Sequence, residues 1–282
     1  KIAAILTICV IAVFSSVGLY GVIEAYSEPR IEKFQLKDDK LKGLERPVTL
    51  IQVTDIHYGL FYDKSNLEGL VNRLNSIAGD AVIMTGDVFH TRQTNVESAP
   101  EVLAKLIPRK FGNFVVMGNH DFYTGENRSI AAFEASGLTV LRDEWRTFSD
   151  GSVFIHLAGL DDPKKNWLLG QQFPNFQDVM EKAPSVDGFR ILLSHRPTVF
   201  PLASENGFEL TLAGHTHGGQ FVFPLSNSQK GWSPASVVSA FTHGWYEHGN
   251  SRMYLNRGAG LTFIPWRINC APEIAVFELM PS

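Results

Sequence analysis

The chain has 282 residues, of which 44% are apolar and 19% are charged, and its formal net charge is −4. This composition is typical of a folded globular protein and excludes an intrinsically disordered chain. Because there is no excess or cluster of Lys and Arg, we expect no nucleic-acid partner. The chain has only two cysteines, which excludes a disulfide-rich scaffold.

The first predicted element is an apolar helix at the N-terminus. Residues 2–23 include no charged side chain, and at about 1.5 Å per residue such a helix crosses a hydrocarbon core of roughly 30 Å. We therefore predict a single-pass transmembrane anchor over residues 1–26 and a tether with one short edge strand over residues 27–47. Two alternatives stay open: a cleaved signal peptide, with a weak cleavage site near Ala25 and Ser27, and a buried helix of a soluble domain.

Residues 48–282 are predicted to form one domain of the α/β class. Apolar segments rich in β-branched residues alternate here with segments of helical pattern, as in proteins whose strands are joined by helices. Strands are predicted at 48–53, 81–84, 113–117, 153–158, 190–194, 208–213, 220–223, 253–256 and 274–279. Helices are predicted at 64–77, 96–106, 128–136 and 176–182.

Residues that commonly bind metals follow five of the predicted strands. These residues are Asp55, His57, Asp87, Asn119, His120, Asp121, His195, His215 and His217. In α/β proteins ligands bind at the carboxyl ends of the strands, so residues from different strand ends come together. In extended backbone, residues i and i+2 point to the same side, and we therefore expect Asp55 beside His57 and His215 beside His217.

A single histidine or aspartate next to a glycine is more often a hydrogen-bonded turn residue than a ligand. Here, however, five of the nine histidines fall at these strand ends, together with three aspartates and an asparagine. Carboxylates, imidazoles and an amide oxygen suit Mn, Fe or Zn, and the lack of cysteine in the set argues against a structural zinc site. The set exceeds the needs of one ion, which favours two divalent ions, an arrangement suited to phosphoester cleavage.

The ordered motifs DIH, GD, GNHD, SH and GHTH resemble the calcineurin-like metallophosphoesterase superfamily. The resemblance extends from residue 48 to the C-terminus and implies an α/β catalytic domain, a two-sheet αββα sandwich preceded by the transmembrane helix. The ligands that it implies for one metal are Asp55, His57, Asp87 and His217, and those for the second metal are Asp87, Asn119, His195 and His215. It also implies that His120 lies near the substrate phosphate and that Asp121 orients it.

The resemblance further implies hydrolysis of a phosphodiester or pyrophosphate bond by a hydroxide that bridges the two metals. The segments TDIHYG, SHRP, GHTHGGQ and NRGAG are most similar to the membrane-associated bacterial branch. That branch includes the YkuE/YaeI-like phosphodiesterases and the chlamydial-type UDP-2,3-diacylglucosamine pyrophosphatase. The expected substrate is UDP-2,3-diacylglucosamine, cleaved to lipid X and UMP in lipid A synthesis at the bacterial inner membrane. The alternative is a tethered phosphatase or nucleotide phosphodiesterase with a soluble substrate.

Four further residues are candidates for substrate contact. His90 stands three places after Asp87, where many superfamily members carry an acidic residue, and Arg196, Asn256 and Arg257 follow other strand ends. For His90 a position in a surface loop, and for Arg196 a surface salt bridge, are equally good interpretations. The stretch 164–169, with two lysines, a tryptophan and two leucines, is a candidate for contact with a lipid tail or the bilayer surface, although ordinary loop packing is the simpler interpretation.

Overall fold

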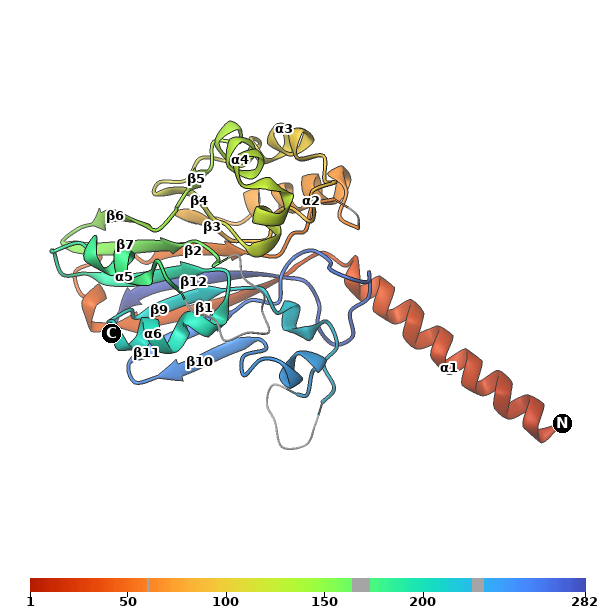
Figure 1. The fold of residues 1–282 in the computed structure, drawn as a ribbon. Helices are drawn as coiled ribbons and strands as arrows, with labels where there is room; N and C mark the ends of the chain where they lie inside the picture. Colours follow the sequence, from red (N-terminus) through yellow and green to blue (C-terminus); the bar gives the residue numbers. More distant parts are fainter. Residues whose placement is uncertain (60, 164–172, 225–230) are drawn as a thin grey trace.

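The computed structural model describes residues 1–59, 61–163, 173–224 and 231–282. Two six-stranded sheets lie face to face, and helices cover their outer faces (Figure 1). The predicted two-sheet αββα sandwich with an apolar N-terminal helix is therefore confirmed. The stretch 164–169, for which we considered a lipid contact, lies outside the described residues.

The first sheet is mostly parallel. Its order is β1-β12-β2-β3-β4-β5, and only the pair of β12 and β2 is antiparallel. The strands are β1 (Arg30–Asp38), β12 (Glu273–Pro281), β2 (Val48–Val53), β3 (Ala81–Thr85), β4 (Gly112–Val116) and β5 (Thr139–Val140). Because β2, β3 and β4 run in the same direction, their carboxyl ends lie at one edge of the sheet.

The second sheet has the order β10-β11-β9-β8-β7-β6, with antiparallel pairs at its two edges and parallel pairs between them. The strands are β6 (Glu144–Asp150), β7 (Val153–Leu160), β8 (Phe189–Ser194), β9 (Leu210–Ala213), β10 (Gly244–His248) and β11 (Ser251–Leu255). The sequence prediction missed β10, because this edge strand has no buried residue and so no apolar pattern. The segment 220–223, predicted as a strand, makes only isolated bridges.

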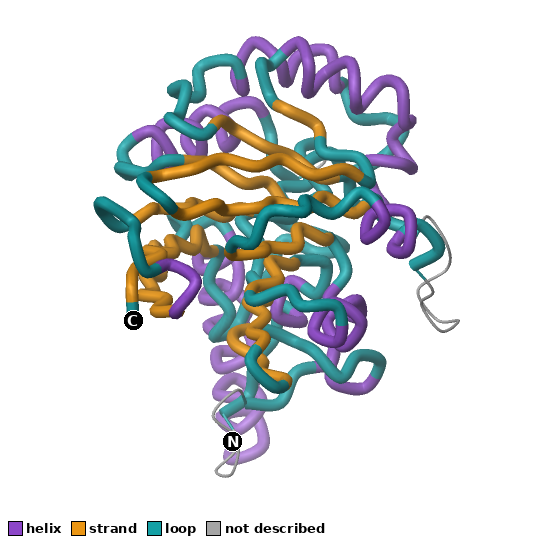
Figure 2. The backbone as a smooth tube through the Cα atoms, turned by 90° about the vertical axis from the view of Figure 1, so that its left-hand side faces the viewer, coloured by secondary structure: helices purple, strands orange, loops and turns teal. Residues whose placement is uncertain are grey.

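Helices pack on the outer face of each sheet (Figure 2). The first sheet is covered by α2 (Lys64–Asn75), α3 (Ala99–Leu103) and α4 (Asn119–Ala135), and the second by α5 (Phe176–Glu181) and α6 (Phe200–Glu205). Short 3₁₀ turns are η1 (Asp39–Leu41), η2 (Val96–Ser98), η3 (Pro197–Val199), η4 (His217–Gly219) and η5 (Pro234–Val237). The central strands of each sheet are thus buried on both faces, whereas the edge strands β6 and β10 are largely accessible to solvent.

Alternating side chains of the first sheet fill two separate cores. Leu50 of β2 and Ile83 of β3 face the second sheet, whereas their neighbours Ile51 and Val82 face the helices. All four are fully buried, and burying a side chain of this size contributes roughly 1.5–3 kcal/mol. Since the strands are held from both sides, their carboxyl ends form a rigid platform.

Helix α4 begins at Asn119, well before the predicted start at residue 128. The carboxylate of Asp121 accepts a hydrogen bond of 2.9 Å from the backbone N–H of Gly118 and thereby caps the new helix. Gly125, with a φ of 126°, interrupts the helix and masks its pattern in the sequence. Residues 119–121 of the GNHD motif therefore lie in the first turn of a helix rather than in a loop.

The N-terminal helix α1 (Ile2–Ala25) has 24 residues and is long and apolar enough to cross a membrane. At about 1.5 Å per residue it is roughly 36 Å long. The segment 27–47, predicted as a tether with one edge strand, contains β1, which pairs with β12 along its whole length. The chain therefore passes from α1 almost directly into the first sheet, while the predicted domain boundaries stay predictions.

Candidate metal centre

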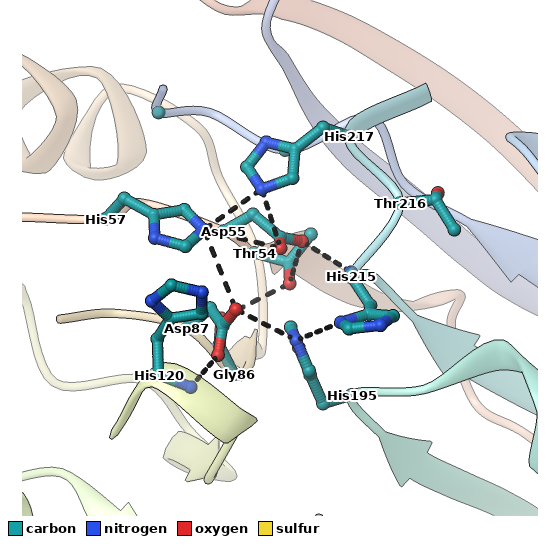
Figure 3. Close-up of polar contacts among 12 residues, drawn as sticks. Thr54, Asp55, His57, Gly86, Asp87, His120, His195, His215, Thr216 and His217 are labelled. Carbon is teal, nitrogen blue, oxygen red and sulfur yellow. Dashed lines mark hydrogen bonds and ion pairs between the residues drawn. The ribbon is translucent and has the colours of Figure 1, made fainter. Parts of the chain in front are cut away.

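The carboxyl ends of β2, β3, β8 and β9 converge, and the polar side chains that follow them point toward one another (Figure 3). The residues that meet in this way are Asp55, His57, Asp87, His195, His215 and His217. Asn119 and His120, from the first turn of α4, line the same cavity. The structure thus brings together at one place the candidate ligands that the sequence distributes over five strand ends.

Five of the seven candidate ligands have a left-handed backbone. Their φ angles are 53° at Asp55, 49° at His57, 52° at Asp87, 80° at His215 and 51° at His217. Residues other than glycine rarely adopt this conformation, which costs about 1–3 kcal/mol each. The expectation of extended backbone at these positions was therefore wrong: sharp turns, fixed by the packed strands, aim the side chains at the site.

The first cluster consists of Asp55, His57 and His217. The Nε2 atoms of the two histidines lie 3.0 Å apart, and His217 Nε2 is 3.2 Å from Asp55 Oδ1. Asp55 Oδ2 accepts hydrogen bonds from Thr54 Oγ1 (2.8 Å) and from the backbone N–H of His215 (2.9 Å). One oxygen of Asp55 is thus fixed by the scaffold, and the other is presented to the cluster.

The second cluster consists of Asp87, His195 and His215. His195 Nε2 lies 3.1 Å from Asp87 Oδ2 and 3.1 Å from His215 Nδ1. Asp87 Oδ1 accepts a hydrogen bond of 2.8 Å from the backbone N–H of His120, while Asp87 Oδ2 is also 3.6 Å from His57 Nε2. This second oxygen therefore lies between the two clusters.

The donor atoms of both clusters suit divalent cations. His195 Nδ1 donates to the carbonyl of Thr85 at 2.9 Å, so Nε2 is the ring nitrogen that faces Asp87. Asp55 Oδ1 and Asn119 Oδ1 are buried and accept no hydrogen bond from the described residues. The site thus has ring nitrogens that face each other and buried oxygens that accept no hydrogen bond. A bound cation would provide these atoms with the partner that they lack.

The electrostatics of the second cluster also favour a bound cation. Burial opposes a charge on His195, but the carboxylate of Asp87 outweighs it and raises the pKa of His195 to about 10. Burial, and then the neighbouring His195, lower the pKa of His215 to about 3. The site therefore stabilises one positive charge next to Asp87, and a bound divalent ion supplies such a charge.

His90 connects a candidate ligand to His120. Its Nδ1 lies 3.1 Å from Nδ1 of His57, and its backbone carbonyl accepts a hydrogen bond of 2.5 Å from Nδ1 of His120. The proton of His120 is thereby placed on Nδ1, which leaves Nε2 as the nitrogen that can exchange a proton. His90 also lines a second cavity with Tyr58 and Thr94, and together with His57 and His120 it forms a third group of side chains that could hold a metal ion.

Asp121 is fully buried and fixes the backbone of two turns. Its carboxylate accepts hydrogen bonds of 2.9 Å from the N–H groups of Phe89 and Gly118. Burial, together with the nearby Asp87, raises the pKa of Asp121 to about 7. Both Asp121 oxygens bond to backbone and the His120 ring bonds to the carbonyl of His90, so the predicted orientation of His120 by Asp121 can act only through the backbone and stays a prediction.

The other candidates for substrate contact are Arg196 and Asn256, which are buried, and Arg257, which is partly buried, and all three have structural contacts. Arg196 pairs with Asp162, with Nη2 3.3 Å from Oδ1, and Asn256 Oδ1 accepts a hydrogen bond of 2.8 Å from the N–H of Gly258. Arg257 forms ion pairs with Glu273 and, at 2.8 Å, with Glu32. His90, Arg196, Asn256 and Arg257 are not among the described residues that line the cavity at the clusters, and their contact with substrate stays a prediction.

The cavity at the two clusters has a volume of about 380 Å³. Besides the candidate ligands, its walls include Tyr123, Thr198, Val238 and Phe263, which the sequence analysis did not identify. Tyr123 follows the GNHD motif closely enough to have been a usable signal. Val238 and Phe263 belong to distant loops, and only the tertiary structure brings them to the cavity.

Comparisons with known proteins identify the family. The family model for calcineurin-like phosphoesterases matches residues 48–219. The chain belongs to this family. The predicted resemblance is therefore confirmed, and the protein is a metal-dependent hydrolase of phosphoesters whose His and Asp clusters are candidate sites for divalent ions.

Relatives and solved structures agree with this assignment. The phosphoesterase is 31% identical over 239 residues to the uncharacterized metallophosphoesterase YkuE of Bacillus subtilis, covering 82% of this chain and 78% of the relative. It is 30% identical over 283 residues to a "transmembrane protein with metallophosphoesterase domain" of Danio rerio, covering 95% of this chain but only 61% of that relative. The solved 5'-nucleotidase precursor of Thermus thermophilus shares the fold, with a TM-score of 0.50 and 14% identity over 83% of this chain and 54% of that one.

The turn before His215 provides a test of the site geometry. A Cβ atom added at Gly214 would lie 2.3 Å from Asp55 Oδ2, so we expect Gly214→Ala to displace this carboxylate. Metal-dependent hydrolysis of a chromogenic phosphodiester should fall roughly 10–100-fold, as when a support of a metal ligand is lost. The matched control is Gly69→Ala in α2, where a Cβ meets nothing within 4 Å. Equal activity of the two variants would contradict the geometry.

Proposed function

We propose that the phosphoesterase binds two divalent metals and hydrolyses a phosphodiester or pyrophosphate bond. The observation that carries this proposal is the position of Asp87 Oδ2, 3.1 Å from His195 Nε2 in one cluster and 3.6 Å from His57 Nε2 in the other. A carboxylate in this position can serve two ions at once. The proposed ligands are Asp55, His57, Asp87 and His217 for one ion, and Asp87, Asn119, His195 and His215 for the other.

Mn, Fe and Zn all suit these nitrogen and oxygen donors. When bound, a pair of such ions activates water and offsets the negative charge that grows on a phosphoryl group. The chain's own contribution is to hold the ligands before the ions arrive. The left-handed turns and the scaffold bonds of Asp55 and Asp87 provide this preorganisation.

His120 is proposed to transfer a proton to the leaving oxygen. It lines the cavity beside His57 and Asp87, and its Nδ1 is bonded to the carbonyl of His90, so Nε2 is the nitrogen available to substrate. Asp121 acts on this group indirectly, because it fixes the turn and the helix start that carry His120.

The proposed substrate is lipid-linked, with UDP-2,3-diacylglucosamine as the specific candidate. Helix α1 and the relative named as a transmembrane protein support attachment to a membrane, which would confine enzyme and lipid substrate to one surface. A role in lipid A synthesis would place the protein at the bacterial inner membrane. The alternative is a soluble phosphomonoester or nucleotide diester, and the site chemistry is compatible with both.

The metal assignment predicts that His215 and His217 bind different metal ions. His215→Ala and His217→Ala should each retain about one of two metal ions per chain, and the double variant should retain neither. Elemental analysis of the dialysed protein measures this, with His248→Ala at the exposed end of β10 as control. Single variants that keep both ions would contradict the ligand assignment.

The proton-transfer role predicts a dependence on the leaving group. His120→Ala should slow hydrolysis of an alkyl phosphodiester by roughly 10²–10⁴-fold, because a poor leaving group needs the proton. Hydrolysis of a p-nitrophenyl diester, whose leaving group is stable as an anion, should slow far less. Measured kcat ratios that are equal for the two substrates would show that His120 acts in another way.

The substrate proposal is tested by the acyl chains. UDP-2,3-diacylglucosamine and UDP-N-acetylglucosamine carry the same pyrophosphate, so a purely soluble-substrate enzyme should cleave both at similar kcat/KM. We expect a clear preference for the acylated substrate presented in mixed micelles, with UMP release as the measurement. Similar rates would favour the soluble-substrate alternative and leave the metal-dependent chemistry intact.

A further inference from the structure

Helix α1 packs against a loop at the mouth of the active-site cavity. The indole N–H of Trp266 donates a 2.9 Å hydrogen bond to the carbonyl of Gly18, and the backbone N–H of Arg267 donates one of 3.0 Å to the carbonyl of Gly21. A Cβ atom at Gly21 would lie 1.6 Å from Trp266 Nε1, so the glycine makes room for the indole. The loop and the helix are thus fitted to each other.

These contacts fix the position of Trp266 along the axis of α1. Gly18 lies seven positions before the helix end at Ala25, a distance of about 10 Å along the axis. The segment from Gly18 to Gly21 belongs to the uncharged stretch 2–23 that would cross the membrane. If α1 spans a bilayer, Trp266 lies at the membrane interface, where tryptophan is enriched in membrane proteins.

Two loops surround the cavity mouth on this side, and we call residues 231–243 and 258–266 the rim loops. Neither contains an Asp, Glu, Lys or Arg. The exposed fractions of their apolar residues are 75% for Val237, 55% for Val238, 86% for Phe263 and 44% for Ile264. Figure 1 shows η5 of the first rim loop, in light blue, on the same side of the sheets as α1.

Apolar rim residues also belong to the active site. Val238 and Phe263 line the cavity at the two clusters of candidate ligands. Exposed apolar residues gathered at a cavity in this way commonly mark an interaction site. Any partner of the rim loops therefore lies at the entrance through which the substrate passes.

The second rim loop places its polar support inside and its apolar side chains outside. Arg267 is fully buried, and its guanidinium donates hydrogen bonds to the carbonyls of Arg257, Gly260 and Cys270. The amide of Gln220 donates to the carbonyls of Ile264 (3.1 Å) and Trp266 (3.0 Å). The loop is therefore a rigid carrier of outward-facing apolar groups, which suits an apolar environment better than water.

We propose that the rim loops insert into the interfacial layer of the lipid bilayer, so that the active-site cavity opens at the membrane surface. The lipid surface is the partner because the rim is continuous with α1, through Trp266, and carries no charge. Amphipathic surfaces of this kind reach roughly 5–10 Å into the boundary of headgroups and acyl chains. A phosphoester at headgroup depth then reaches the clusters without leaving the bilayer. This proposal depends on α1 spanning the membrane and not on the acyl preference proposed above.

Depth-dependent fluorescence quenching tests the insertion. The exposed Cys9 is first replaced by alanine, and Cys270 is fully buried and does not react with the label. A single accessible cysteine is then introduced by Val237→Cys or Ile264→Cys and labelled with bimane. Val186→Cys is the matched control, because Val186 is 48% exposed and lies at the other end of the sheet. It precedes the amino end of β8, whereas His195 of the site follows the carboxyl end of the same strand. Six residues of strand place this control about 20 Å farther from the rim. Near-UV circular dichroism in detergent checks the folding of each variant.

The labelled chains are placed in nanodiscs of phosphatidylethanolamine and phosphatidylglycerol that contain doxyl lipids. Labels at 237 and 264 should be quenched by the lipid nitroxides at a depth of roughly 5–10 Å and protected from aqueous iodide. The label at 186 should show the reverse. Iodide quenching of labels at 237 and 264 equal to that at 186 would overturn the proposal. Protection from both quenchers would also overturn it, because the rim would then be covered by protein, such as a second copy of the chain.

Discussion

The burial of two carboxylates, Asp55 and Asp87, where the two sheets meet is the constraint on which the rest of the site depends. Each carboxylate is fixed through one oxygen and presents the other to imidazole nitrogens. In a medium of low polarity such charges need a positive partner, and the raised pKa of His195 shows how strongly Asp87 attracts one. The left-handed turns, the helix start at Asn119 and the glycine contacts at Gly214 all serve to hold these groups close to one another.

The end of the molecule that carries the metal centre combines a rigid protein interior with an apolar, exposed cavity mouth. The sheets and their covering helices keep the candidate ligands rigid, while the cavity walls include two uncharged loops, one of which contacts α1 through Trp266. A hydrolytic centre that must exclude bulk water from its ligands, yet admit a phosphoester, is served by an entrance with apolar walls. On this reading α1 acts as more than a tether, because its packing against the rim fixes the orientation of the cavity relative to the helix axis.

Much of the fold and the site could be predicted from the sequence, and the misses have physical causes. The strand ends and their metal-binding residue types were predictable, because apolar segments end abruptly at charged or polar groups beside glycine. The start of α4 was missed because Gly125 disrupts the helical pattern, and β10 because it has no buried residue. The positions of His90 and Arg196 could not be predicted, since one is set by contact with His57 and the other by burial against Asp162.

The sequence by itself determined the chemical inventory of this phosphoesterase: an uncharged N-terminal helix, strands in alternation with helices, and five strand ends with carboxylate, imidazole and amide groups. These features are local, because each depends on the residue types and spacing within one short segment. Only the tertiary structure decided how the groups divide into clusters, which oxygen of each aspartate faces the imidazole nitrogens, and that Val238 and Phe263 line the cavity. Those properties depend on the register of the sheets and on contacts between residues more than one hundred positions apart, such as His57 with His217, and no local pattern encodes such contacts.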